Sequence, residues 1–397
     1  MSRYLVVAGL FVLSLITYVD RAAISSVKDG LAAELALDDR AIGAVFSVFA
    51  LGYAVAQIPS GWLADRLGPR LMLAGMVALW SLLTAWTGRA GSLASLLVIR
   101  FLFGVAEAGA FPGMARAFFN WLPASERGRA NGIVFSGSRL GAAGAFPLMA
   151  WLLSAGGWRQ TFFWLAAPGL SWAVLWLLLF RDRPAQPIAA SESGDGGIPL
   201  AQAIRTRPMQ RAMLQYFGAN FTTFLCLSWM NPYLKQRYAL STDTAAYYTM
   251  AILLVSATAQ WTTGFVVDRL FASSRRDISR SRPAMVGFAI SAAGAALIPF
   301  APTAAIAAAC FSLAAFGVEM TISPSWAFCV DLGGRHSGAV SGAMNMAGNF
   351  GSFVSANAFP WLQGASGDAT TYFALVCLLN LVGCWCWRGM RPTMAER

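Results

Sequence analysis

Two opposite charges lie in an otherwise apolar stretch of the chain. In RFLFGVAEAG, at residues 100–109, Arg100 and Glu107 are seven positions apart. On an α-helix this spacing is almost two turns, so both side chains share one face and lie about 10 Å apart along the axis. A direct salt bridge cannot cover that distance. Each charge therefore needs a partner elsewhere in the fold, or a ligand between the two.

Asp20 and Arg21 form a second charged pair in an apolar segment. They are adjacent, and on a helix they point about 100° apart. A guanidinium is well suited to hold a carboxylate, because its planar donors match the two oxygens. Burial favours the neutral, protonated form of an acidic side chain. Arg21 and Arg100 are therefore candidates for binding an organic anion, and Asp20 and Glu107 for carrying protons.

Arg139 and Glu319 also lie well inside apolar segments. A charge at the centre of a membrane helix costs roughly 2.5–3.5 kcal/mol, so each such residue is a functional candidate. The alternative for any one of them is a structural ion pair that locks two helices together. Glu319 is a third candidate proton carrier, and Arg139 is a candidate for a conformational role.

The elements that must position these charges are long and apolar. The 397 residues are 57% hydrophobic and only 12% charged, whereas soluble domains carry about 25% charged residues. A helix needs roughly 20 residues to cross a bilayer core, and most of the apolar segments reach that length. We expect an all-α, polytopic membrane protein with twelve transmembrane helices, near 4–27, 40–60, 71–88, 93–116, 130–153, 159–180, 209–234, 244–267, 284–301, 303–327, 337–360 and 370–388.

The net charge of +11 reflects an uneven distribution of basic residues. If the N-terminus is inside, most of the Lys and Arg residues fall in cytoplasmic loops, as the positive-inside rule requires. This bias needs no nucleic acid as a partner. Both termini are then cytoplasmic, and a bacterial inner membrane is the expected location. The first apolar run has the length of a signal peptide, but no A-x-A site follows, so we expect a retained helix.

One hydrophilic linker divides the chain into two parts. Residues 181–208 are rich in Pro, Gly, Ser and charge, which is typical of a loop. The linker separates an N-terminal bundle, residues 1–180, from a C-terminal bundle, residues 209–397. Each bundle contains six of the expected helices.

The two bundles carry matching motifs. GWLADRL at 61–67 matches GFVVDRL at 264–270, and EAGAFP at 107–112 matches EMTISP at 319–324. Two matches at similar offsets indicate an internal repeat, and hence two pseudo-symmetric six-helix bundles. Repeats of this kind commonly form a substrate site near the midplane, where they meet.

GWLADRLGPR, at 61–70, resembles the loop signature of the major facilitator superfamily. Pro69 departs from the pattern. In the family this loop stabilises one conformation of the carrier. The resemblance therefore implies a gating role for the matching residues Gly61, Asp65, Arg66 and Arg70, and for Asp268 and Arg269 in the second copy.

Four further stretches resemble one branch, the anion:cation symporter family, which includes bacterial sugar-acid transporters and the vesicular glutamate and sialic acid carriers. These stretches are TYVDRAAIS (17–25), RFLFGVAEAGAFP (100–112), NWLPASERGRANGIVFSGSRLGAA (120–143) and GAMNMAGNFG (342–351). By that likeness Arg21 and Arg100 bind the substrate carboxylate, and Asp20 and Glu107 carry protons.

Two pairs of polar residues, each one helical turn apart, have two interpretations. Tyr53 and Gln57 form the first pair, and Asn345 and Asn349 the second. They can hydrogen-bond the hydroxyls of a substrate, or they can join helices by bonds worth roughly 0.6–2 kcal/mol. The sequence leaves both interpretations open.

The expected function is proton-coupled symport of a small organic anion by alternating access, with sugar acids as the leading class. We expect a monomer without metal or cofactor. An exporter, or a facilitator without proton coupling, shares every fold feature. A membrane enzyme is disfavoured, because the six Cys form no C-x-x-C motif and the only histidine, His336, lies in a short loop.

Overall fold

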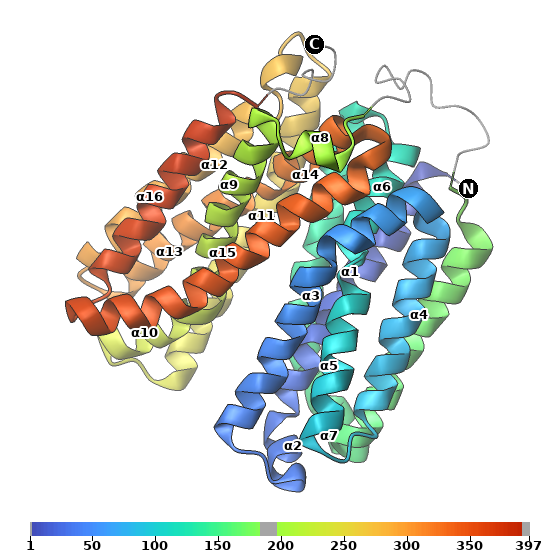
Figure 1. Cartoon of the computed structure of the whole chain (residues 1–397). Coiled ribbons are helices and arrows are strands. Elements are labelled where there is room, and N and C mark those ends of the chain that lie inside the picture. Colours follow the sequence, from blue (N-terminus) through green and yellow to red (C-terminus); the bar gives the residue numbers. More distant parts are fainter. Residues whose placement is uncertain (1, 183–196, 391–397) are drawn as a thin grey trace. The chain divides into compact units, whose positions relative to one another are not determined.

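A computed structural model describes residues 2–182 and 197–390 (Figure 1), and the regular structure of these residues is helical. The first part of the chain forms α1 (Arg3–Ser26), α2 (Lys28–Leu35), α3 (Asp39–Leu67), α4 (Pro69–Thr87), α5 (Leu93–Glu107), α6 (Ala110–Trp121) and α7 (Arg127–Leu179). The second part forms α8 (Leu200–Ala203), α9 (Arg207–Phe224), α10 (Met230–Tyr238), α11 (Thr242–Phe271), α12 (Ser281–Leu297), α13 (Ala304–Glu319), α14 (Ile322–Gly333), α15 (Ser337–Ser366) and α16 (Thr370–Trp387).

These helices account for the twelve predicted segments, although some segments are broken and others are joined. The fourth segment consists of α5 and α6, and the tenth of α13 and α14. The fifth and sixth are joined in α7, where Gly157 breaks the helix with a φ of 69°. The seventh runs from α9 to α10 through a π-helical turn, Leu225–Trp229. The predicted all-α membrane fold is confirmed.

The chain forms two compact units. Unit 1 comprises Met1–Pro123, Ile133–Gly197 and Gly333–Gly342, and unit 2 comprises Ala124–Gly132, Ile198–Leu332 and Ala343–Arg397. In this division the start of α7 groups with unit 2 and the start of α15 with unit 1, and the expected bundle boundaries stay a prediction. Residues 183–196 of the expected linker lie outside the described residues, and α8 lies in its remaining part.

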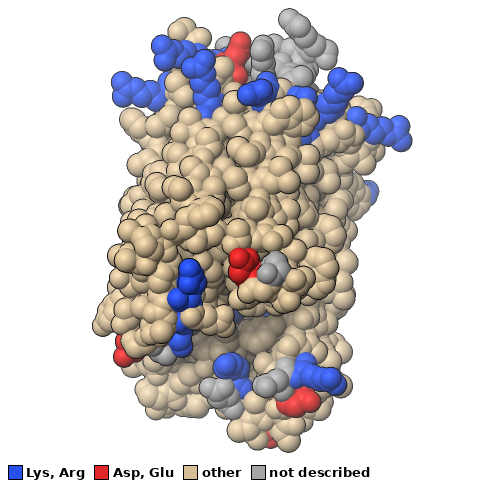
Figure 2. All heavy atoms as spheres, turned by 90° about the vertical axis from the view of Figure 1, so that its left-hand side faces the viewer, with Lys and Arg blue, Asp and Glu red and all other residues tan. Residues whose placement is uncertain are grey.

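Large apolar side chains face outward on many helices, as a lipid environment requires. Leu178, Phe300 and Trp361 are more than 70% exposed. On the face drawn in Figure 2, basic side chains gather toward the two ends and a broad tan band lies between them. Nine helical stretches of the described chain are long and apolar enough to cross a membrane, and one of them, residues 304–365, combines α13 to α15.

Glycines bring α3 and α5 into close contact within unit 1. A Cβ on Gly52 would lie 2.3 Å from the carbonyl oxygen of Phe101, and one on Gly104 would lie 2.3 Å from that of Phe49. Any larger residue at either position would push the two backbones apart. This contact fixes the level at which the side chains of α3 meet the charges of α5.

Candidate functional site

The buried glutamate of α5 is paired with an arginine from α1. The Nε atom of Arg21 donates a hydrogen bond to Oε1 of Glu107. The Glu107 side chain is 0% exposed, and that of Arg21 is 23% exposed. Arg100 and Glu107 share a helix face, but the partner of Glu107 comes from another helix, in agreement with the seven-residue spacing.

Arg100 is surrounded by rings. Its guanidinium carbon lies 4.8 Å from the ring centre of Phe49 and 4.9 Å from that of Phe103. Arg100 is only 4% exposed, and in the described part of the chain no carboxylate lies within salt-bridge distance of it. A buried guanidinium held mainly by aromatic faces retains hydrogen-bond donors for an anion.

Aromatic residues also line Arg21. Its guanidinium carbon lies 4.5 Å from the ring centre of Tyr53, 5.1 Å from that of Tyr18 and 5.6 Å from that of Phe49. Phe49 therefore contacts both arginines. Sequence reasoning missed Phe49, although it precedes Tyr53 by one helical turn and so shares its face.

Asp20 completes the charged group of unit 1. It is 4% exposed and lies near Glu107, Arg100 and the Trp80 indole of α4. Trp80 is another residue that the sequence did not single out. Two arginines and two carboxylates thus share one buried region, with Tyr53 beside them and the fully buried Gln57 one turn farther along α3.

The helix breaks place two carboxylates at helix ends. Glu107 is the last residue of α5, and Glu319 is the last residue of α13. The C-terminal end of a helix carries partial negative charge, which disfavours a carboxylate there. The repeated E-x4-P motif therefore places each glutamate where its neutral form is favoured or where a cation must accompany it.

In unit 2, Glu319 has a neutral partner. Gln260 of α11 donates a hydrogen bond through Nε2 to Oε2 of Glu319. Gln260 is 0% exposed and Glu319 is 4% exposed. Sequence analysis did not single out Gln260, although the repeat places it in the same register as Gln57.

The two predicted asparagines lie in the part of α15 that belongs to unit 2. Nδ2 of Asn349 donates to the backbone oxygen of Asn345 at 2.8 Å. Gly348, between them, packs against the Tyr216 ring and the Asn220 amide of α9. The Tyr216 hydroxyl in turn accepts a hydrogen bond from the Trp326 indole at 2.8 Å. Asn345 and Asn349 therefore border a buried polar cluster.

The predicted gating carboxylate of unit 1 caps a helix. Asp65 accepts hydrogen bonds from the backbone nitrogens of Gly338 and Ala339, each at 2.8 Å. These two amides begin α15, where unpaired N–H groups attract negative charge. A Cβ on Gly61 would lie 2.3 Å from the Gly338 oxygen, so only glycine allows this approach of α3.

Asp268 makes the equivalent contacts in unit 2. It accepts from the backbone nitrogens of Gly128 and Arg129 at the start of α7, each at 2.8 Å. Arg280, 0% exposed, lies 3.8 Å from Asp268 and 3.1 Å from Asp331. Asp331 also pairs with Arg127 at 2.6 Å. Sequence analysis singled out Asp268 but missed its partners, because they come from the ends of separate helices.

The other predicted gating residues have simpler surroundings. Arg66 lies 5.2 Å from the Trp62 ring centre and is exposed, as is Arg269. Arg70 donates through its backbone nitrogen to Asp182 at 2.9 Å and through Nε to the Leu177 oxygen at 3.1 Å. Arg139 is half-buried on α7, which packs closely on α1 at the neighbouring Gly137 and Gly141.

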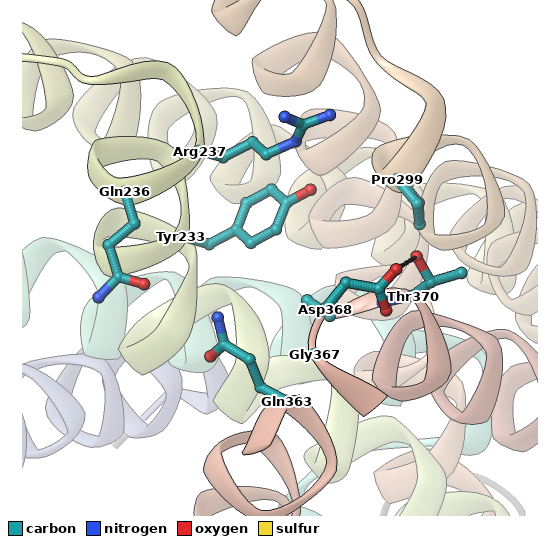
Figure 3. A pocket seen from close by; sticks show the side chains of 9 residues that line it. Tyr233, Gln236, Arg237, Pro299, Gln363, Gly367, Asp368 and Thr370 are labelled. Carbon is teal, nitrogen blue, oxygen red and sulfur yellow. Dashed lines mark hydrogen bonds between the residues drawn. The ribbon is translucent and has the colours of Figure 1, made fainter. Parts of the chain in front are cut away.

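A pocket of about 380 Å³ opens in unit 2 beside the end of α10 and the start of α16. In Figure 3, Tyr233 and Arg237 of α10 lie across from Asp368, and Asp368 is bonded to Thr370 at the start of α16. None of the site residues predicted from the sequence lines this pocket. Its carboxylate serves to start a helix, so we do not assign it to the predicted site.

Comparisons with known proteins give one family. A model described as Major Facilitator Superfamily matches residues 10–356. The probable sulfoacetate transporter SauU of Cupriavidus necator is 31% identical over 396 residues, covering 96% of this chain and 92% of its own. A probable L-galactonate transporter of Escherichia coli is 31% identical over 390 residues, covering 94% and 85%. The transporter FucP, a fucose:proton symporter of Escherichia coli, has a similar structure, with a TM-score of 0.78 at 17% identity, covering 98% of this chain and 99% of its own.

Proposed function

The chain belongs to the Major Facilitator Superfamily, and from this premise we propose that it is a proton-coupled symporter of a small organic anion. Its relatives are transporters, and the prediction that it is not an enzyme is confirmed. We place it as a monomer in a bacterial inner membrane with both termini cytoplasmic. The bundles 1–180 and 209–397 would alternate access to a site near the midplane.

The ion pair between Arg21 and Glu107 carries the proposal. An anion that binds Arg21 competes with the carboxylate of Glu107 for the same donors. If Glu107 stayed ionised after losing its partner, the uncompensated buried charge would cost about 3–5 kcal/mol. A proton on Glu107 removes that charge. Anion binding at Arg21 and proton binding at Glu107 therefore favour each other, and this linkage is reciprocal.

Arg100 and Asp20 extend the same arrangement. Arg100 supplies a second cation whose described neighbours are mainly rings, so it can bind a carboxylate without first breaking an ion pair. Asp20 is a second proton carrier in the same region. Tyr53, Asn345 and Asn349 are the proposed contacts for hydroxyl groups, and Glu319 is a third site that can hold a proton.

The substrate class follows from the arginines and agrees with the relatives. Sulfoacetate and L-galactonate, which name the two relatives, are both organic acids. A carboxylate fits the planar fork of a guanidinium. We therefore propose a sugar acid or another small carboxylate as the substrate.

Uptake into proteoliposomes tests this function. Labelled L-galactonate or sulfoacetate would be added outside vesicles whose interior is alkaline, and a dye trapped inside would report the internal pH. Symport predicts that the anion accumulates above its outside concentration and that the interior becomes more acidic when the anion is added. A facilitator would only equilibrate the anion, whatever the pH gradient. Anion-driven proton flow in the opposite direction would identify an antiporting exporter.

A further inference from the structure

Gln57 and Gln260 occupy equivalent positions in the two repeats. QIPSGWLADRL at 57–67 and QWTTGFVVDRL at 260–270 align with Gln, Gly, Asp and Arg in the same register. The glutamates of the E-x4-P motif are likewise equivalent, and each ends the first half of a broken helix. Each unit thus contains one such glutamine and one such glutamate.

In unit 2 the glutamine and the glutamate are bonded to each other. Gln260 donates through Nε2 to Glu319, and Oε1 of Gln260 is buried without a hydrogen-bond donor among the described atoms. A protonated carboxyl has one O–H donor and one acceptor oxygen, which complement the two ends of an amide. An ionised carboxylate can only accept. The arrangement therefore suits a protonated Glu319, whose O–H would satisfy Oε1 of Gln260.

In unit 1 the equivalent residues lie at the same level but Glu107 has another partner. Both Gln57 and Glu107 are 0% exposed. Two contacts with α3 bracket them. A Cβ on Gly104 would lie 2.9 Å from the Tyr53 nitrogen, and a Cβ on Gly109, besides meeting two methionines of α4, would lie 3.2 Å from Cβ of Ser60. On α3, Gln57 lies between Tyr53 and Ser60. Glu107 lies between Gly104 and Gly109, so the two side chains are at the same level. In this structure Glu107 is bonded to Arg21.

We propose that Gln57 receives the side chain of Glu107 whenever Glu107 is protonated, with or without the anion, and that this leaves Arg21 to the anion, as Gln260 holds Glu319. This inference rests on the proposed symport. Gln57 is then a positioning residue for the proton carrier, and not a contact for substrate hydroxyls.

Several charged or titratable groups surround Glu107, and each could contribute to the pH dependence of anion binding. Asp20 and Arg21 face it from α1, Tyr53 from α3 and Arg100 from its own helix. Of these groups, Asp20 is the other one that can release or take up a proton in the acidic range. A test must therefore separate Glu107 from Asp20.

The experiment is a pH profile of anion binding to the purified protein. The probe is L-galactonate or sulfoacetate, whichever the parent accumulates in the vesicle assay. In Gln57→Met the neutral form of Glu107 loses its hydrogen-bond partner, so anion binding should require a lower pH. We expect the midpoint of the profile to move about one pH unit lower, which corresponds to about tenfold weaker binding on the alkaline side. At the acid end the affinity should equal that of the parent.

The double variant Gln57→Met/Glu107→Gln provides the control. Compared with Glu107→Gln alone, the double variant should show no pH-dependent loss of affinity for the anion. Any such loss would implicate Asp20 and overturn the inference. If the affinity of Gln57→Met for the anion were lower by the same factor at every pH, the inference would also be overturned, because that result indicates a direct contact with the substrate. If Gln57→Met does not give folded protein, Gln57→Asn, which keeps a shorter amide, must show the same shift. A parent without proton-coupled uptake would reject the proposed function before any variant is compared.

Discussion

At the scale of residues, Arg21 and Arg100 differ in what surrounds them. Arg21 holds the carboxylate of Glu107, whereas Arg100 is packed between the rings of Phe49 and Phe103. Arg100 can therefore receive an anion first, and Arg21 only after its ion pair opens. In the proposed symport the two residues therefore have the same chemistry but would act at different stages of binding.

Replacing Arg100 by Lys should weaken anion binding. Lysine keeps the charge but loses the planar pair of donors. A lost charge-assisted hydrogen bond costs about 1.5–3 kcal/mol, which is roughly a 10- to 150-fold weaker Kd. Equilibrium binding and thermal unfolding of Arg100→Lys would be measured together. Normal binding with a lower melting temperature would show that Arg100 is structural instead.

Glu107→Gln should separate binding from coupling. The amide imitates the protonated acid, so Arg21 becomes available to the anion at every pH. We expect exchange of labelled for unlabelled substrate across the vesicle membrane to persist, while accumulation driven by a pH gradient is lost. If the variant accumulates substrate as the parent does, the coupling proton travels through Asp20 or Glu319.

At the scale of elements, carboxylates from one helix cap the start of another in both units. Asp65 of α3 holds the first amides of α15, and Asp268 of α11 holds those of α7. Because a helix start has unpaired N–H groups, a carboxylate there supplies both hydrogen bonds and charge. Glycines at the crossings allow the approach.

Two glycines of α3 should respond oppositely to alanine. Gly61→Ala places a methyl group 2.3 Å from a backbone oxygen, and overpacking of this kind costs about 1–3 kcal/mol. A Cβ on Gly43 would meet nothing within 4 Å, so Gly43→Ala should stabilise the helix by about 0.5–1 kcal/mol. Melting temperatures in one detergent would check this, and equal values for the two variants would contradict the close contact.

The α2 helix is tied to α7 by a pair that should be sensitive to acid. Glu34 accepts from the Trp158 indole at 2.6 Å and from Nε of Arg159 at 2.8 Å. The Arg159 and Trp158 hydrogen bonds lower the pKa of Glu34. A lowered pKa stabilises the fold above the pKa of the unfolded chain, and this contribution is lost as pH falls through the folded value.

Glu34→Gln should therefore lower the melting temperature slightly at neutral pH, and the difference from the parent should vanish in acid. The effect is small because the pair is exposed. Thermal unfolding at several pH values would measure it, and a difference that persists in acid would exclude the ion pair as its cause.

At the scale of the whole molecule, the uneven distribution of basic residues sets the expected orientation. Positive loops stay on the cytoplasmic side of a membrane. The loop between α11 and α12, residues 272–280, carries several arginines, whereas that between α4 and α5, residues 88–92, carries one. The first loop should be cytoplasmic and the second external.

Cysteine labelling of intact cells tests this orientation. Ser273→Cys and Gly91→Cys, each in a background without the six native cysteines, should differ in access to a reagent that does not cross membranes. Gly91→Cys should react and Ser273→Cys should react only after lysis. Equal labelling of both in intact cells would reject the topology.

The sequence by itself determined the class of protein and singled out most of the charged residues of the candidate site. Each membrane-crossing segment must be long, apolar and helical by its own composition, because lipid offers its backbone no hydrogen-bond partner. Buried charges stand out in such segments for the same reason. The helical spacing of Arg100 and Glu107 also showed that they could not pair directly.

Only the tertiary structure decided which charges are partners and what lies beside them. Arg21 reaches Glu107 from a helix 86 positions earlier in the chain, and Gln260 reaches Glu319 from another helix. Phe49, Phe103 and Trp80 could not be singled out, since an aromatic residue in an apolar helix has the same sequence pattern whether it faces lipid or a charge. Side-chain partners depend on how helices pack, and local sequence carries little of that information.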